Sequence, residues 1–147
     1  MLFRSTSMTT LRYKLLAGMP PPAYQTAGAS GIDLCARLPM VIHPGATVRM
    51  PLGIAVEIPT GYEGQLRPRS SRSLEGVLLH DGTIDSDYRG EISAVLTNVS
   101  RIGVVYIVPG DRIAQLVIAP VERVELVRVE QLSETARGTG AFGSTGR

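Results

Sequence analysis

Two aspartates that stand two positions apart are the strongest indication of chemistry in this sequence. Asp85 and Asp87 lie in the stretch TIDSDYRGEI, next to Tyr88. On an extended chain the two carboxylates would share one face and the tyrosine ring would point to the other. Paired carboxylates beside an aromatic ring suggest a general base with a neighbouring ligand or structural partner. A turn with exposed acidic side chains is the alternative interpretation.

Two further polar stretches could serve a phosphate or a metal ion. The stretch RPRSSRS, residues 67–73, holds arginines that can fork onto phosphate oxygens and serines that can donate hydroxyls, although a solvated loop would have a similar composition. In ASGIDLCA, Asp33 follows Gly31 just before an expected strand. An aspartate there caps its own backbone in a turn, or it provides an oxygen ligand, direct or through water, for a hard cation such as Mg²⁺.

The chain ends in RGTGAFGSTGR, residues 137–147, which is too rich in glycine to form a regular element. One interpretation is a frayed end. The other is an arm that orders over an anionic ligand: glycine lets backbone amides approach phosphate, arginine neutralises charge, and the ring of Phe142 offers a flat face to a base.

Other catalytic chemistries have little support in the sequence. His43 and His80 each stand in an expected turn, so neither Asp-His-Ser nor zinc-ligand spacing is present. Cys35 is the only cysteine, which leaves no disulfide framework, and its apolar neighbours predict a small buried residue.

Composition favours a globular cytoplasmic protein. The chain has 147 residues, of which 44% are hydrophobic and 19% charged, and a net charge of +2. Lys14 is its only lysine, so a nucleic-acid partner is not expected. No apolar run reaches the ~18 residues of a membrane span, so no membrane partner is expected either. Residues 1–7 are interpreted as an extension before Met8.

The elements that must position these side chains are predicted to be β-strands. Turn signals at 43–45, 59–61, 80–82 and 109–111 separate short runs rich in valine and isoleucine, many of which alternate apolar with polar residues. The runs are residues 47–58, 63–69, 91–100, 103–108, 112–121 and 123–129. Only 71–76 and 130–136 favour a helical turn. This pattern predicts an all-β sandwich or jelly roll. We expect a single β domain over residues 1–136 and an arm over 137–147.

Five stretches together, in this order, resemble the ordered motifs of the trimeric dUTP diphosphatases, or dUTPases. They are ASGIDL (29–34), RPRSS (67–71), GTIDSDYRGE (82–91), PGDRIAQL (109–116) and RGTGAFGSTG (137–146). The resemblance extends from about Met8 to Arg147. It implies a β jelly roll that assembles as a homotrimer, with each active site at a subunit boundary and closed by the C-terminal arm.

The resemblance also implies roles for individual residues on the nucleoside. Asp85 matches the aspartate that orients and activates water, and Tyr88 the tyrosine whose ring leaves no room for a 2′-hydroxyl. Phe142 resembles the ring that stacks on uracil. Backbone groups of residues 79–84, which include Leu79, Thr83 and Ile84, are expected to bind the edge of the base, because a peptide offers both donor and acceptor.

On the phosphates, the resemblance assigns Arg69, Ser70 and Ser71 to the binding segment of the second motif, and Gln115 to that of the fourth. Asp33 matches the aspartate near the waters of a bound Mg²⁺. The arm residues on the terminal phosphate are Arg137, Ser144 and Thr145.

Three positions depart from the family's pattern. Ser71 replaces a usual glycine and Ala141 a common one, and Leu79 stands where many bacterial members have asparagine, in a shortened segment between the second and third motifs.

The implied reaction is hydrolysis of dUTP to dUMP and pyrophosphate by attack of water on the α-phosphorus, which limits uracil in DNA and supplies dUMP for dTMP synthesis. dCTP deaminase, which has a similar fold, is the nearest alternative. That enzyme needs a proton-shuttling glutamate, and the matching position here is Val95. A non-catalytic nucleotide-binding jelly roll is the other alternative.

Overall fold

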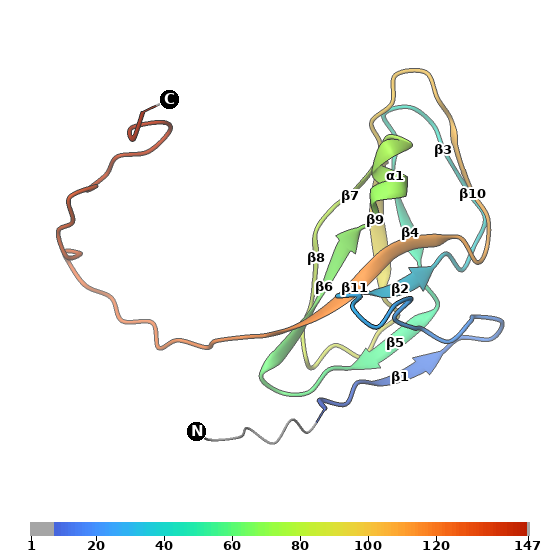
Figure 1. Ribbon diagram of the computed structural model, residues 1–147, viewed down its shortest axis with the longest axis horizontal. Helices are drawn as coiled ribbons and strands as arrows, with labels where there is room; N and C mark the ends of the chain where they lie inside the picture. Colours follow the sequence, from blue (N-terminus) through green and yellow to red (C-terminus); the bar gives the residue numbers. More distant parts are fainter. Residues whose placement is uncertain (1–7, 147) are drawn as a thin grey trace.

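Antiparallel β-strands make up nearly all the regular structure of the protein (Figure 1). The computed structural model describes residues 8–146. The strands are β1 (Arg12–Leu15), β2 (Ile32–Cys35), β3 (Met40–Ile42), β4 (Thr47–Pro51), β5 (Ile54–Glu57), β6 (Tyr62–Pro68), β7 (Val77–Leu79), β8 (Gly82–Ile84), β9 (Ser93–Asn98), β10 (Val105–Ile107) and β11 (Arg112–Pro120). Within the described part of the chain, the one helix is α1 (Ser70–Leu74).

The strands form two larger sheets and two pairs. One sheet has the order β2-β11-β6-β8 and the other the order β4-β9-β7, while β1 pairs with β5 and β10 with β3. Neighbours in a sheet are mostly distant in sequence, as a jelly roll requires. The predicted all-β jelly roll is therefore confirmed.

The core is apolar and fills the space between the sheets. In β9 the inward residues Ala94, Leu96 and Asn98 are buried, while Val95 and Thr97 alternate with them toward the outside. Asn98 is the only buried polar residue named among the described residues, and its amide donates to the carbonyls of Ile42 and Gly103 at 2.9 and 2.7 Å. In β9, the alternation of residues in the sequence thus corresponds to a strand face that packs into the core.

One predicted strand is divided into two. The run over residues 47–58 breaks at Leu52 and Gly53, so that β4 joins one sheet and β5 pairs with β1. Gly53 has φ +66°, a left-handed conformation that glycine adopts without strain. Leu52 and Ile54, on both sides of Gly53, are apolar and buried, so the hydrophobic pattern of the sequence continues across the break and does not reveal it.

The predictions for residues 123–129 and 130–136 are wrong: the first stretch forms no strand and the second no helix. A strand requires a neighbour to bond its backbone. After β11 the chain leaves the body of the protein in a long arc (Figure 1), and the side chains of Val124 and Leu126 are 71% and 91% exposed. The segment carries a strand's sequence pattern, but residues 8–146 provide no partner strand for it.

Three of the four predicted turns are present, at 43–45, 59–61 and 109–111. The fourth, at 80–82, is instead a direct link between sheets: β7 pairs with β9, and β8, which begins at Gly82, pairs with β6. Strands β1, β3, β7 and β8 were not predicted, because each has only three or four residues and shows little periodicity. No helix among residues 8–146 is long and apolar enough to cross a membrane.

Candidate active site

A pocket of about 280 Å³ lies beside the end of β8. That size is just below the usual range of about 300–1,000 Å³ for small-ligand sites. Its wall includes Arg49, Thr83, Ile84, Asp85, Tyr88 and Val95. Four of these six were predicted as site residues, so the structure brings the residues expected around a nucleoside to one hollow. Leu79 is different: its side chain is 5% exposed in the core, and it pairs with Leu96 in the β7–β9 ladder.

The pair of aspartates lies in a tight turn and not on an extended chain. The backbone N–H of Tyr88 donates to the carbonyl of Asp85 at 3.1 Å, and Arg89 closes the turn by donating to the carbonyls of Ser86 and Tyr88 at 2.7 and 3.0 Å. The expectation that Asp85 and Asp87 share a strand face is therefore wrong. The turn instead places Asp85 and Tyr88 in the wall of the same pocket.

The pocket has an aliphatic side chain at the position that matches the glutamate of dCTP deaminase. Val95 lies in the wall, where dCTP deaminase would need a proton-shuttling carboxylate. An aliphatic side chain cannot transfer a proton, so the pocket suits hydrolysis better than deamination.

A second group of predicted residues surrounds Asp33, which is the second residue of β2 and not, as expected, in the turn before it. Its side chain is 11% exposed and lies between two guanidinium groups. Arg69 Nε is 3.1 Å from Oδ1, and Arg112 Nη1 is 3.2 Å from Oδ2. Two cations around one carboxylate leave an excess of positive charge here, which is suited to an anionic ligand. Sequence reasoning missed Arg112, although it follows the Pro-Gly-Asp turn in a stretch that resembles the family.

Ser70 and Ser71 begin helix α1. Arg72 pairs with Glu75 at the end of the same helix at 2.8 Å, and its ion pair with Asp111 at 2.9 Å connects the helix to the turn before β11. Ser71 has no positive φ, so the serine that replaces the usual glycine is accommodated without backbone strain.

Gln115 lies next to this group, on β11, and its amide donates to the carbonyl of Pro68 at 3.0 Å. A Cβ at Gly31 would be only 2.8 Å from the Cβ of Gln115. The glycine is therefore needed for this close packing.

The two groups of residues lie at separate places on the same sheet. In the strand register Asp33 is opposite Gln115, which is opposite Arg67, whereas Ile84 at the far edge of the sheet is opposite Gly64. Asp33 and Ile84 are therefore separated by three strand spacings across the sheet and by about three residues along the strands. The distance between these two positions is on the order of 15–20 Å. A single chain therefore does not bring Asp85 to the arginines around Asp33.

The C-terminal residues stand apart from both groups. The segment 137–146, to which Arg137, Phe142, Ser144 and Thr145 belong, lies on the arc that extends away from the body (Figure 1). Within residues 137–146, Arg137 Nε donates to the carbonyl of Gly140 at 2.9 Å, and the Phe142 ring is fully exposed. Phe142 is the only residue other than glycine in the described chain with a positive φ, at 51°.

Residues 8–146 contain no cluster of three or more histidine, cysteine or acidic side chains that could form a metal cage. With its oxygens occupied by arginines, Asp33 suits contact with the waters of a phosphate-bound cation better than direct ligation. The nearby Cys35 is free and half-buried. Burial, and then the charge of Asp33, raise the pKa of its thiol, which keeps it in the unreactive protonated form.

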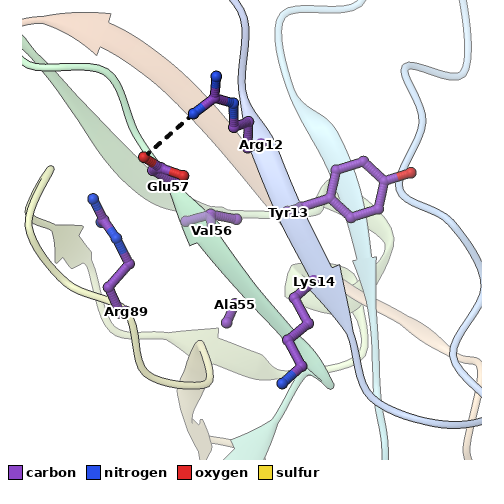
Figure 2. A pocket seen from close by; sticks show the side chains of 7 residues that line it. All are labelled: Arg12, Tyr13, Lys14, Ala55, Val56, Glu57 and Arg89. Atoms are coloured by element: carbon purple, nitrogen blue, oxygen red, sulfur yellow. Dashed lines mark ion pairs between the residues drawn. The ribbon is translucent and has the colours of Figure 1, made fainter.

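Figure 2 shows another pocket, of about 250 Å³, on one face of the paired strands β1 and β5. Arg12, Lys14 and Arg89 line it, and Glu57 pairs with Arg12 at 3.7 Å. None of the residues predicted to act on a nucleotide lies in this pocket.

Comparison with known proteins decides the family. The model of the family described as dUTPase matches residues 18–146. The chain belongs to the dUTPase family.

Bacterial relatives of this dUTPase are similar over most of their length. A deoxyuridine 5'-triphosphate nucleotidohydrolase of Anaeromyxobacter sp. is 52% identical over 129 residues, which are 86% of this chain and 87% of the relative. One from Beijerinckia indica is 50% identical over 136 residues, 88% of this chain and 84% of the relative.

Solved dUTPases have the same fold. The Staphylococcus bacteriophage 80alpha dUTPase with dUPNHPP has a TM-score of 0.90 and 29% identity, and the match covers 95% of this chain and 100% of that one. A mutant dUTPase from phage phi11 of S. aureus, which coordinates a structural Mg(II) ion, has a TM-score of 0.79 and 27% identity over 83% of this chain and 97% of that one.

Proposed function

We propose that this dUTPase hydrolyses dUTP to dUMP and pyrophosphate at sites that its subunits share in a homotrimer. Membership of the family makes it a nucleotide hydrolase, and its relatives are named for hydrolysis of dUTP. The observation that carries the proposal is the pocket in which Asp85 and Tyr88 share a wall. The substrate is a cellular nucleotide, which favours a cytoplasmic location.

Asp85 acts as the general base. Its side chain is exposed at the pocket, and the turn that ends at Tyr88 holds its backbone. A carboxylate there accepts a hydrogen bond from water, orients it toward the α-phosphorus and takes its proton. No covalent intermediate is needed, since the water is the nucleophile.

Tyr88 selects the sugar. Its hydroxyl donates to the backbone carbonyl of Glu91 at 3.0 Å, so the ring is held at the pocket wall and the hydroxyl is occupied. A fixed ring against C2′ of the sugar leaves no space for a ribose hydroxyl, and deoxyribose is preferred for steric reasons.

The backbone of β8 binds uracil. β8 is the edge strand of its sheet, with β6 on one side only. An edge strand leaves a row of N–H and C=O groups unpaired, which can bond to the donor and acceptor on the edge of a base. Thr83 and Ile84 lie at the pocket, and their backbones serve this role without the asparagine found in many bacterial members.

The group around Asp33 binds the triphosphate. Arg69 and the hydroxyls of Ser70 and Ser71 contact phosphate oxygens, and Gln115 faces the same ligand from β11. Asp33 would hold water ligands of a Mg²⁺ ion bound to the triphosphate. Such an ion would supply charge neutralisation and would help to position the phosphate chain for in-line attack.

The separation of the two groups supports a shared site. Residues that must act on one nucleotide lie on the order of 15–20 Å apart in a single subunit, so a second subunit must supply one of the groups. The apolar residues Val124, Leu126 and Val129 on the departing chain are also exposed in the described part of the subunit. Both features favour a trimer, and the arm of one subunit closes a site formed by others, with Phe142 on the base and Arg137, Ser144 and Thr145 on the terminal phosphate.

One assay tests the proposal: release of pyrophosphate from dUTP, dCTP, dTTP and UTP, each with and without Mg²⁺. We expect rapid release from dUTP alone and a strong dependence on the metal. Formation of a uridine nucleotide from dCTP would instead support a deaminase. Nucleotide binding with no pyrophosphate release would support a non-catalytic protein.

A further inference from the structure

Glu91 connects the loop that carries Tyr88 to other parts of the chain, because its backbone bonds to Tyr88 and its carboxylate bonds to Arg37 and Gly53. Its backbone carbonyl accepts the Tyr88 hydroxyl at 3.0 Å. Its carboxylate accepts two hydrogen bonds from Arg37, from Nε to Oε1 at 2.7 Å and from Nη2 to Oε2 at 3.2 Å. A third bond comes from the backbone N–H of Gly53 to Oε1 at 2.9 Å. We call Glu91, Arg37 and Gly53 the Glu91 clamp.

The clamp joins the loop to rigid parts of the fold. The backbone N–H of Arg37 donates to the carbonyl of Pro51 at the end of β4, at 3.0 Å. Ile92, which follows Glu91, exchanges backbone bonds of 2.9 and 2.8 Å with Leu52 and Ile54. The end of the loop is thus fixed at the point where the chain passes from β4 to β5.

The ion pair is shielded from solvent. The side chains of Arg37 and Glu91 are 32% and 25% exposed, whereas those of the surface pair Arg12 and Glu57 are 79% and 49% exposed. A bidentate, partly buried pair holds its geometry far better than an exposed one, which water and salt weaken.

The ring of Tyr88 has little freedom above this support. It lies directly over Gly90: a Cβ added there would collide with the ring hydroxyl and would be 2.6 Å from Cζ. The ring is therefore confined between the Gly90 backbone and the pocket, with its hydroxyl tied to the residue that the clamp holds.

We propose that the Glu91 clamp positions Tyr88 and thereby sets the preference of the enzyme for deoxyribose over ribose. The inference rests on the proposed role of Tyr88 in sugar selection. Glu91 and Arg37 act through the tyrosine as positioning residues: a shift of the loop moves the ring off C2′ and opens space for a hydroxyl. Shifts of about 1 Å cost up to 10²-fold in rate where geometry is tight.

The test measures kcat/KM for dUTP and for UTP in Glu91→Gln, Arg37→Met and the double variant. Glutamine keeps the shape of Glu91 but places an amide donor toward a guanidinium donor. We expect the dUTP-to-UTP ratio to fall roughly tenfold in each single variant. The double variant should be no worse than the more affected single variant, because both changes break one clamp.

Glu57→Gln, which breaks the exposed pair with Arg12, is the matched control and should keep the ratio. Suppose that the Glu91→Gln variant has a lower melting temperature and still keeps the wild-type dUTP-to-UTP ratio. That result would show that the clamp only supports the structure, and it would overturn the inference. A wild-type enzyme that hydrolyses UTP as well as dUTP would overturn the role of Tyr88 itself. The two failures are therefore distinguishable.

A second variant displaces the ring and leaves the clamp residues unchanged. Gly90→Ala introduces the Cβ that collides with Tyr88, so the ratio should fall as it does in Glu91→Gln. Gly103→Ala is the control, since its nearest neighbour would be Ser100 Oγ at 3.4 Å. An unchanged ratio in Gly90→Ala, with the fold intact, would also contradict confinement of the ring as the source of selectivity.

Discussion

Removal of the arm after Ala136 should separate stability from catalysis. Within residues 137–146, the recorded hydrogen bonds of the arm link it only to itself or to Thr135, and the Phe142 ring is fully exposed. Deleting a segment with no packed contacts changes the free energy of unfolding by about 0.5 kcal/mol or less. The truncated protein should therefore keep its oligomeric state and its melting temperature.

The effect of truncation on catalysis follows from two opposing energies in the ground state: the contacts of the arm with bound dUTP and the entropy cost of ordering the arm nearly cancel. Stacking of Phe142 is worth about 1–3 kcal/mol. A charged bond from Arg137 adds about 1.5–3 kcal/mol, and two hydroxyl bonds about 0.5–1.5 kcal/mol each. Against this total of about 4–9 kcal/mol stands an ordering cost of roughly 1 kcal/mol for each of about ten residues. The arm thus adds little to the binding of dUTP.

Its contribution should appear in the transition state, where charge on the phosphates shifts and a single well-placed donor is worth about 10²–10³ in rate. We expect truncation to lower kcat about 10²-fold or more while KM changes less than about tenfold. Steady-state pyrophosphate release measures both constants, and Phe142→Ala should show part of the loss. As an independent check, tryptic cleavage at Arg137 should slow with a non-hydrolysable dUTP analogue and Mg²⁺. A truncated protein with full activity would refute the reasoning and make the segment a frayed end.

Four further outcomes are expected. Asp85→Asn should keep fold and nucleotide affinity while kcat falls roughly 10²-fold or more, and a near wild-type rate would remove Asp85 from the role of base. Tyr88→Ala should weaken binding and erode the preference for dUTP over UTP; unchanged discrimination would place the ring away from the sugar. Light scattering should give about three times the chain mass of 15.7 kDa, and a fully active monomer would contradict shared sites. Because the pKa of the Cys35 thiol is raised, iodoacetamide should modify it slowly at neutral pH and faster only as the pH approaches that pKa; rapid modification at pH 7 would contradict this.

The sequence predicts the fold where burial and alternation coincide. The runs that became β6, β9 and β11 have an apolar inner face, and their pattern reports it directly. The break at Gly53 was not predictable in this way, because apolar residues continue across it. The prediction for residues 123–129 failed for the opposite reason: their pattern is that of a strand, but strand formation depends on a partner strand, and the described part of the chain does not offer one.

The residue types of the site were predictable from the order of the motifs, but their distances were not. Asp85 and Asp87 stand two positions apart, and only the turn that bonds Tyr88 to Asp85 shows that they do not share a strand face. Arg112 was missed because its importance lies in contact with Asp33, a residue far away in sequence. The support of Tyr88 by Glu91 was equally hidden, since it combines a side-chain pair with a backbone carbonyl.

The distance between Asp85 and the arginines around Asp33 has a genetic consequence if the sites are shared as proposed. A subunit with a defective base would still lend its arginines to a neighbour, and a subunit with defective arginines would still lend its base. Two inactive alleles expressed together would then recover part of the activity in mixed assemblies, because some boundaries would receive an intact half from each. A single defective allele beside a normal one would lower the activity only in proportion to its share of the protein, because each defective subunit spoils one boundary even where a normal neighbour supplies the other half.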